Sequence, residues 1–487
     1  MTKTIKHRQI NQTLNMKSLF TKFSILAAVA VTALFTGCSS QPEPKYIFYF
    51  IGDGMGLNQV IGTEMYNEAK GLTPEEANLS FTDFPVQGCM TSHSGTSYVT
   101  DSAAAGTALA TGAKARNDQV GLDVNEKPLA SLVDIAAENG YKTALVSNVA
   151  VNHATPSVFY GHLANRKDYE KLTRQTIECN VDFLAGASLI DEKDNATFAE
   201  RWIEKAKQAG WTVLRTADEA AATDSDRVML LADTLSRESM RYAIDCHEQD
   251  PNLEQYTKAA ISYLERKAPK KFFMMVEGGH IDYALHNNDL TASFEEVNDM
   301  DRAVKLALDF YEKHPKETLI VVVADHETGG LSLGGYNSYK LHIENTIHQK
   351  VSMEHLTVQL RHLRNTGRTS WEEVKGQLCE SLGLWGPVNV TPEEEKALYD
   401  TYLHSFIGNL DRRVVSLYAD NERLAFEATM LISKKAHITW TTMTHTGAHV
   451  PYFVKGIGAE NFLTVRDNTH VPQRIAELMG GSLPRFE

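Results

Sequence analysis

Four side chains that can bind a metal ion each follow a long apolar run of the sequence. They are Asp53, Glu277, Asp325 and His326. In open α/β sheets, ligands bind at the carboxyl ends of the strands, where such residues would meet. A single acidic residue after a strand is common in a turn, but recurrence would direct several carboxylates into one crevice. Because like charges held that close raise each other's pKa unless a cation neutralises them, the pattern predicts bound metal ions.

A second group has the spacing of a metal site on a helix. Asp282 and His286 are four residues apart and share one face if this segment is helical. One more imidazole would make a three-ligand site with an open position, which is the pattern of catalytic zinc. His445 is the candidate third ligand, and His449 is an alternative for that role. For His280 we expect a place beside the ligands or facing solvent.

A candidate nucleophile lies in the segment 100–114, TDSAAAGTALATGAK. Its small residues would let a helix that begins near Asp101 and Ser102 pack closely against its neighbours. A serine hydroxyl there would lie near free backbone N–H groups and the positive end of the helix dipole, which suits an anionic substrate. Metal coordination can activate such a hydroxyl without a histidine base. The alternative is that Asp101 or Ser102 only caps the helix.

The elements that would position these groups follow from the hydrophobic pattern. Continuous apolar runs are typical of strands buried on both faces. These runs cover 45–51, 143–146, 272–276 and 319–324, with a weaker strand at 452–454. Apolar residues recur at helical spacing in two segments, 252–267 and 292–314. This alternation predicts an α/β fold, a doubly wound and mostly parallel sheet with helices on both faces.

A long polar segment interrupts the alternation. Residues 335–438 are largely helix-like with few strand signals, and we interpret them as a helical insertion between two core strands.

The composition of the whole chain is that of a globular protein. The chain has 487 residues, of which 43% are hydrophobic, so it can bury a large core. Its net charge of −14 argues against a nucleic-acid partner, because proteins that bind nucleic acid carry a basic surface. Five cysteines are far too few for a disulfide scaffold.

The first residues have the features of a secretory signal. Residues 1–37 carry five lysines and arginines and no acidic residue, with an apolar run at 23–35. The small residues before Cys38 resemble a bacterial lipoprotein box, in which Cys38 is lipidated and becomes the new N-terminus. We therefore expect a lipoprotein signal peptide at 1–37, a tether at 38–44 and a folded domain at 45–487. The lipid anchor would hold the protein in the bacterial cell envelope, on the periplasmic or surface side. An ordinary cleaved signal and an uncleaved anchor are the alternatives.

Six short stretches, taken together, resemble the alkaline phosphatase family. They are 51–56 (IGDGMG), 100–104 (TDSAA), 153–156 (HATP), 276–286 (VEGGHIDYALH), 324–330 (ADHETGG) and 444–447 (THTG). They occur in the family's order and extend from about residue 45 to the C-terminus. A lone Gly-Asp-Gly would carry no weight, but the joint match is highly specific.

The resemblance implies a phosphate monoester hydrolase that forms a phosphoserine on Ser102. The implied ligands are Asp282, His286 and His445 for a first zinc ion, and Asp53, Asp325 and His326 for a second. Asp53 would also bridge to a magnesium ion held by Thr155 and Glu277, because oxygen ligands favour that ion. Arg166 would clamp the phosphate with two hydrogen bonds, the alternative being a solvated surface arginine. The resemblance also suggests a homodimer.

Two positions depart from the best-known bacterial pattern of the family. His153 stands where many bacterial members have Asp, and Tyr283 stands where they have Lys. We place His153 beside the magnesium ligands and not among them. The change bears on how tightly the third site holds magnesium and on whether zinc takes its place. The reaction type is not expected to change.

Two rival functions stay open at this point. One is another metalloenzyme of the superfamily, such as a phosphodiesterase or a cofactor-independent phosphomutase. Thr155, Glu277 and Arg166 favour a monoesterase over this rival. The other is a lipid-anchored protein that binds phosphate without turning it over, and an intact Ser102 beside metal ligands counts against it.

Overall fold

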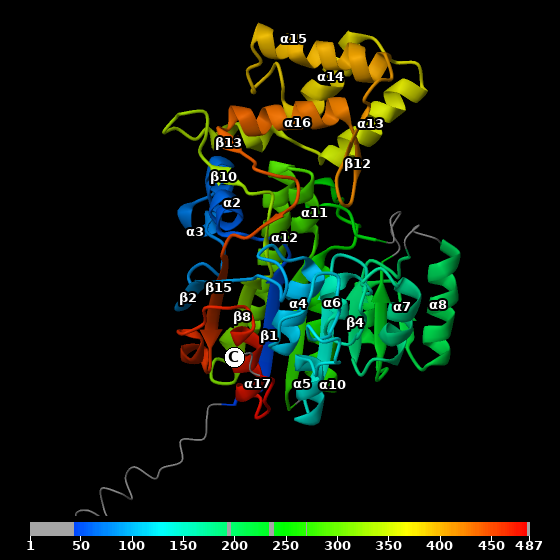
Figure 1. The fold of residues 1–487 in the computed structure, drawn as a ribbon, viewed down its shortest axis with the longest axis vertical. Coiled ribbons are helices and arrows are strands. Elements are labelled where there is room, and N and C mark those ends of the chain that lie inside the picture. Colours follow the sequence, from blue (N-terminus) through cyan, green and yellow to red (C-terminus); the bar gives the residue numbers. More distant parts are fainter. Residues whose placement is uncertain (1–42, 192–195, 233–237, 269, 485–487) are drawn as a thin grey trace, which may run out of the picture. The chain divides into compact units, whose positions relative to one another are not determined.

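A computed structural model describes residues 43–191, 196–232, 238–268 and 270–484 (Figure 1). The predicted signal peptide, Cys38 and most of the predicted tether lie outside these residues, so they stay predictions. Among the helices of the described ranges, none is long and apolar enough to cross a membrane. All four cysteines in this part of the chain are free thiols.

The centre of the protein is a mostly parallel sheet. Its strands are β1 (Tyr46–Gly52), β2 (Val86–Met90), β3 (Lys142–Ser147), β4 (Phe183–Gly186), β5 (Thr212–Leu214), β6 (Val228–Leu231), β7 (Phe272–Gly278), β8 (Thr318–Ala324) and β15 (Val450–Gly456). They lie in the order β2-β15-β8-β1-β7-β3-β4-β6-β5. β15 pairs antiparallel with both of its neighbours, and all other neighbouring strands are parallel. The middle strands β1, β7 and β8 are almost entirely buried and apolar, as expected for strands that helices cover on both faces.

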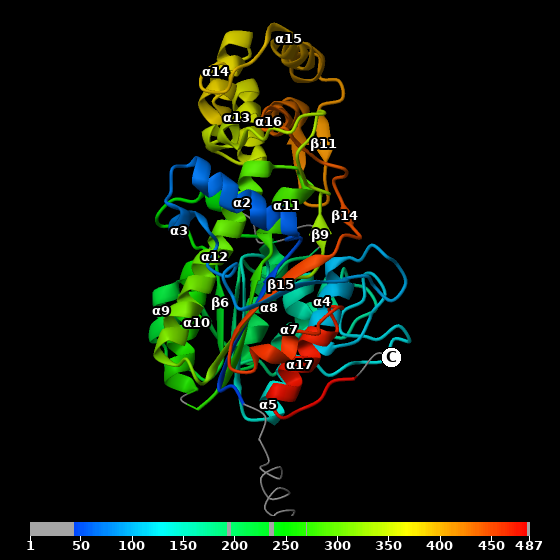
Figure 2. The same cartoon turned by 90° about the vertical axis from the view of Figure 1, so that its left-hand side faces the viewer.

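Helices lie on both sides of this sheet. Outside the insertion they are α2 (Leu57–Ala69), α3 (Pro74–Ala77), α4 (Ser102–Thr111), α5 (Leu132–Glu138), α6 (Ala154–Ser157), α7 (Tyr169–Glu178), α8 (Ala196–Gln208), α9 (Ala217–Ala222), α10 (Leu253–Lys267), α11 (His280–His286), α12 (Leu290–Lys313) and α17 (His470–Leu478). Figure 2 shows α10 and α12 on one side of the sheet and α4, α5 and α17 on the other. The predicted α/β class with helices on both faces is therefore confirmed.

The sequence pattern locates the long elements better than the short ones. The five predicted strands correspond to β1, β3, β7, β8 and β15, and the two predicted helices correspond to α10 and α12. The pattern does not predict β2, β4, β5 and β6, which have only three to five residues each. Runs that short do not stand out from the apolar faces of nearby helices.

The insertion lies between β8 and β15, which are neighbours in the sheet. It contains η2 (Ile343–His348), α13 (Met353–Asn365), α14 (Trp371–Leu382), α15 (Pro392–Thr401), η3 (Tyr402–Ile407), β11 (Arg413–Val415), β12 (Asp420–Glu422) and α16 (Arg423–Lys435). These helices enclose an apolar cluster of their own, which includes Leu356, Leu378 and Leu424. Figures 1 and 2 show α13 to α16 at one end of the folded part, beyond α11, whereas α5 and α17 lie at the opposite end.

Candidate active site

Three neighbouring strands bring carboxylates to one edge of the sheet. β1 lies between β7 and β8, and the last residues of the three strands are in register. Asp53 follows the end of β1, Asp325 follows the end of β8, and Glu277 is next to last in β7. All three side chains are fully buried. The parallel register thus places together the acidic residues that the apolar runs single out.

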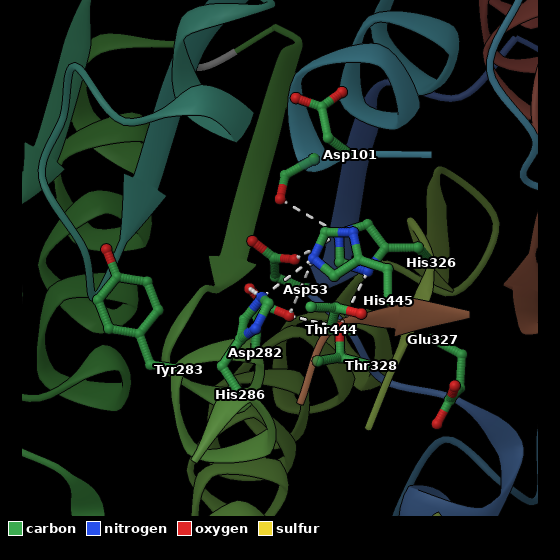
Figure 3. Close-up of polar contacts among 12 residues, drawn as sticks. Asp53, Asp101, Asp282, Tyr283, His286, His326, Glu327, Thr328, Thr444 and His445 are labelled. Atoms are coloured by element: carbon green, nitrogen blue, oxygen red, sulfur yellow. Dashed lines mark hydrogen bonds and ion pairs between the residues drawn. The ribbon is translucent and has the colours of Figure 1, made fainter. Parts of the chain in front are cut away.

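A short helix and a pair of two-residue strands supply a second group. α11 follows β7 after one residue, and on it Asp282 Oδ2 lies 3.3 Å from His286 Nε2. β9 (Glu327–Thr328) pairs antiparallel with β14 (His445–Thr446). This pairing brings His445 Nε2 to 3.1 Å from His286 Nε2. Figure 3 shows the two imidazoles beside each other at the site.

The two groups have the composition and spacing of metal sites. One is Asp282, His286 and His445, the other is Asp53, Asp325 and His326, and within each group the ligand atoms lie within 4.8 Å of one another. Both carboxylate oxygens of Asp53, and one each of Asp282 and Asp325, are buried without a hydrogen-bond partner. Leaving a buried polar atom unpaired costs about 1–3 kcal/mol, and more for a charged group. These donor sets therefore fit bound divalent cations.

Backbone carbonyls set the orientation of two of the imidazoles. His286 Nδ1 lies 2.7 Å from the carbonyl oxygen of Met443, and His445 Nδ1 lies 2.8 Å from that of Thr100. A carbonyl only accepts, so each Nδ1 carries the proton and donates it. The Nε2 atoms that face the site then keep free lone pairs, as metal ligation requires.

Thr328 connects the two groups. Its hydroxyl donates to Asp282 Oδ1 and accepts from His326 Nδ1, which lies 3.2 Å away. His326 therefore also presents an unprotonated Nε2 to the site. Thr328 is not among the predicted site residues, although it lies inside the motif 324–330, and its place in that motif is the signal that could have identified it.

Burial and mutual repulsion control the charges at the site. Burial, reinforced by neighbouring carboxylates, raises the pKa of Asp53 and of Asp325 well above the usual range. Burial also raises the pKa of Glu277 to about 7. The pKa values of His326 and His445 are lowered, mainly by burial, which keeps these imidazoles neutral and able to ligate. A nearby divalent charge would reverse the shifts of the carboxylates.

A third set of atoms consists of oxygens only. Thr155 on α6 and Glu277 on β7 are fully buried, and Thr155 Oγ1 and Glu277 Oε1 have no hydrogen-bond partner. Ser147 Oγ donates to the other Glu277 oxygen at 2.6 Å and so orients the carboxylate. Glu277 lies beside Asp53 because their strands are adjacent and in register. Magnesium prefers such oxygen ligands.

Ser102 is the first residue of α4 and is fully buried. The cap of this helix is Asp101, whose Oδ1 accepts a hydrogen bond of 2.9 Å from the N–H of Ala104. Because Asp101 does the capping, the Ser102 hydroxyl is free to face the site, and its Oγ lies 3.2 Å from His326 Nε2. The hydroxyl therefore adjoins the group formed by Asp53, Asp325 and His326.

Arg166 faces the site and not the solvent. Its side chain is 12% exposed, and Nη1 lies 3.6 Å from Asp101 Oδ2. Nη2 donates to His153 Nε2 at 3.1 Å, and this imidazole nitrogen also lies 3.4 Å from the hydroxyl of Tyr283. Arg166 is thus not the solvated surface arginine of the alternative interpretation. Asp101 and His153 hold its guanidinium, and this role of Asp101 is absent from the sequence-based prediction.

Three other positions complete the comparison with the sequence-based predictions. His449 is exposed and belongs to neither metal group. His280 is buried and stacks on Tyr242 with ring centroids 4.6 Å apart, so of the two places expected for it the solvent-facing one is excluded. Tyr418 comes from the insertion and stacks on Tyr283 with ring centroids 3.7 Å apart. No motif surrounds Tyr418 in the sequence, so sequence reasoning does not identify it.

Comparison with known proteins identifies the family. The family model for alkaline phosphatase matches residues 44–480. The chain is 31% identical over 483 residues to alkaline phosphatase 4 of Bacillus subtilis, with 93% of this chain and 95% of that protein covered. It is 27% identical over 459 residues to the alkaline phosphatase of Schizosaccharomyces pombe, with 88% and 80% covered. The crystal structure of a cold-active alkaline phosphatase from Shewanella sp. matches with a TM-score of 0.74 and 26% identity, covering 89% of this chain and 99% of that one. The chain belongs to the alkaline phosphatase family and is a metal-dependent phosphatase.

Proposed function

We propose that this protein hydrolyses phosphate monoesters through a phosphoserine on Ser102, with two zinc ions and one magnesium ion. The observation that carries the proposal is the distance of 3.2 Å between Ser102 Oγ and His326 Nε2. It puts a free hydroxyl beside a group of potential metal ligands, where such a hydroxyl can become a nucleophile without a general base.

The reaction has two displacements at phosphorus. In the first, Ser102 Oγ forms a bond to phosphorus, the bond to the ester oxygen breaks, and the alcohol leaves with a proton from solvent while the serine proton is lost to solvent. In the second, a water oxygen bonds to phosphorus and the bond to Oγ breaks, which yields inorganic phosphate and restores the serine. Divalent ions in the two ligand groups would supply the positive charge that activates hydroxyl and water and stabilises the attacking and leaving oxygens.

The residues of the chain position the phosphate for both steps. Ser102 begins α4, so the free N–H groups and positive dipole of that helix end face the anion. Arg166 can hold two phosphate oxygens with its planar guanidinium. Asp101 and His153 fix the orientation of that guanidinium through the contacts of 3.6 and 3.1 Å. No side-chain acid or base has to act, which agrees with the neutral imidazoles around the serine.

The donor atoms support the choice of metals. Two groups combine imidazole nitrogen with carboxylate oxygen, which suits zinc. The set of Asp53, Thr155 and Glu277 offers oxygen alone, which suits magnesium. His153 directs Nε2 to Arg166, and we therefore place it beside the magnesium ligands.

The test compares a chromogenic phosphate monoester with a matched diester, each with and without a chelator. We expect turnover of the monoester, its loss on chelation, and its return when zinc and magnesium are added. Turnover of the diester alone would favour a phosphodiesterase, and added phosphomutase substrates would reveal that activity. Binding of phosphate without any turnover in the presence of zinc would favour the phosphate-binding lipoprotein.

For the part of the chain before residue 43 we propose a lipid anchor on Cys38 that holds the enzyme at the outside of a bacterial membrane. The sequence of residues 1–38 supports this location. The Cys38→Ala variant of the full chain is then expected to leave the membrane fraction, and continued membrane association would point to an uncleaved anchor.

We also propose a homodimer, on the basis of the family resemblance. Light scattering on the detergent-solubilised protein measures the molar mass and so tests this oligomeric state.

A further inference from the structure

One hairpin of the insertion reaches the candidate active site. β11 and β12 form its two antiparallel strands, and Tyr418 lies in the turn between them. Ser416 Oγ and Asn421 Nδ2 donate to the side-chain oxygen of Asn287 at 2.8 and 2.9 Å. Asn287 is buried and directly follows His286. These bonds tie the hairpin to the end of α11, which carries two of the candidate zinc ligands.

Ion pairs hold the other end of the hairpin. Glu422, at the end of β12, pairs with Arg364 at 2.6 Å and with Arg361 at 3.2 Å, both from α13. Arg412, next to β11, pairs with the same carboxylate at 3.1 Å. The hairpin is therefore fixed between the helices of the insertion and α11, and the position of Tyr418 follows from both attachments.

The ring of Tyr418 packs against residues of the site. It stacks on Tyr283 with an interplanar angle of 8° and ring centroids 3.7 Å apart. The centroid of His286 lies 5.3 Å away and that of His153 lies 5.9 Å away, both in edge contacts. The ring thus bridges a candidate zinc ligand and the histidine that holds Arg166.

The hydroxyl of Tyr418 lacks a partner. It is buried and makes no hydrogen bond to the protein. Burial raises the pKa of Tyr418 well above the usual range, and the charge of Arg166 opposes this shift. Buried phenol hydroxyls almost always find a partner, because an unmet hydrogen bond costs about 1–3 kcal/mol. Because the ring that carries this unmet donor packs against His153, which holds the phosphate-clamping Arg166, the substrate is the partner that the site can offer.

We propose that Tyr418 is a substrate-contacting residue, whose hydroxyl donates a hydrogen bond to an oxygen of the phosphate group held by Arg166. The insertion would then supply one wall of the phosphate pocket and make the site complete. This inference rests on the proposed function, because it assigns a residue to the binding of the same phosphate.

The test replaces the hydroxyl and keeps the ring, in Tyr418→Phe. Loss of a hydrogen bond to a charged oxygen is expected to lower kcat/KM for the chromogenic monoester by about 10- to 100-fold. The inhibition constant of inorganic phosphate is expected to rise by a similar factor, while zinc content and melting temperature stay unchanged. A structural role alone would change stability and leave the inhibition constant as it is.

Tyr402→Phe is the matched control. Tyr402 also lies in the insertion, and its hydroxyl already has a partner, because it donates at 2.6 Å to the carbonyl of Thr369, which is not a residue of the site. This variant is expected to lose some stability and to keep both kcat/KM and the phosphate inhibition constant.

The outcomes separate this inference from the proposed function. If the wild type hydrolyses the monoester and Tyr418→Phe retains its kcat/KM and phosphate inhibition constant, the inference is overturned and the proposed function stands. If the wild type shows no turnover, thermal stabilisation of the zinc-loaded protein by inorganic phosphate replaces the kinetic readout. A smaller stabilisation in Tyr418→Phe than in Tyr402→Phe would support the contact, and equal stabilisation would refute it.

Discussion

The protein buries carboxylates in two regions and surrounds them in different ways. In the insertion, Glu422 is 1% exposed and receives three arginines. Burial acts to raise the pKa of Glu422, but these arginines hold it below the usual value. At the edge of the sheet, Asp53 and Asp325 are equally buried. Within the described residues their ion-pair partner is His326, an imidazole that burial keeps neutral.

This difference shows which of the two regions requires a bound cation from outside the protein. An ionised carboxylate cannot be buried without a compensating charge, so a fold either supplies the cation or leaves a place for one. The insertion supplies arginines for Glu422, so this cluster holds the insertion together without an external cation. The edge of the sheet supplies imidazoles and unpaired oxygens, which together are the donors of a metal site. The contrast can be tested by changing each region separately.

The largest effect is expected from Ser102→Ala. Loss of the nucleophile is expected to reduce monoester turnover by about 10⁴-fold and to abolish the phosphoprotein that mass spectrometry detects after acid quenching. Ser370→Ala is the matched control, because Ser370 caps α14 in the insertion. It is expected to cost about 1 kcal/mol of stability without changing turnover. Unchanged turnover in Ser102→Ala would exclude Ser102 as the nucleophile.

The next effect concerns the insertion. Glu422→Gln leaves three arginines around a neutral group and is expected to lower the free energy of unfolding by about 3–5 kcal/mol. The zinc content of the folded protein is expected to stay the same, as measured by urea unfolding and metal analysis. Asp400→Asn provides the control, since its pair with Lys396 is exposed and contributes within about 0.5 kcal/mol. Loss of zinc in Glu422→Gln would contradict the separation of the two regions.

The stability of the metal-free protein, measured over a range of pH, tests the raised pKa of a buried carboxylate at the site. Burial raises the pKa of Glu277 to about 7 in the folded protein, from 4.5 for an unperturbed glutamate, so the native state binds more protons than the unfolded state between these pH values. The contribution of Glu277 to the free energy of unfolding is therefore fully present below pH ~4.5. It is lost as the pH rises through ~7, and the total loss is about 3 kcal/mol.

The comparison of wild type with Glu277→Gln isolates this contribution. His326, whose lowered pKa gives the opposite slope, is present in both proteins and cancels in the difference. Urea unfolding in chelator is expected to show the wild type losing stability relative to the variant across this pH range. A difference that grows in favour of the wild type as pH rises would contradict the pKa direction.

The smallest effect is expected at His153. His153→Ala removes the acceptor of the Arg166 hydrogen bond and is expected to lower kcat/KM by about 2- to 10-fold. Magnesium content is expected to stay unchanged, because His153 lies beside the ligands in our assignment. A parallel loss of magnesium would show that His153 ligates the metal.

Much of the site could be predicted because its residues follow strong local signals. Asp53 and Asp325 stand at the ends of long apolar runs, and Asp282 and His286 have helical spacing. His445 has no such signal of its own, and a shared family motif was needed to single it out. The parallel register of β1, β7 and β8 then places these residues in one site, because it brings the ends of the strands together.

The features that could not be predicted depend on contacts between distant segments. Tyr418 lies 135 residues after Tyr283, and the attachments of the hairpin to Asn287 and to the arginines of α13 bring their rings together. The arginines of Glu422 likewise come from two segments, α13 and the residue before β11, and their spacing in the sequence does not predict that they meet. Residues in an insertion acquire such roles through packing, which a hydrophobic pattern does not record.

The most direct test is the metal content of the purified full chain, measured by inductively coupled plasma mass spectrometry. We predict about two zinc ions and one magnesium ion per chain, lost together with activity on chelation. The Asp53→Ala variant, which removes the carboxylate shared by two sites, is predicted to hold clearly less of both metals. A wild-type protein that holds no divalent metal and still hydrolyses the monoester at full rate would contradict the view that the unpaired acids and imidazoles form metal sites.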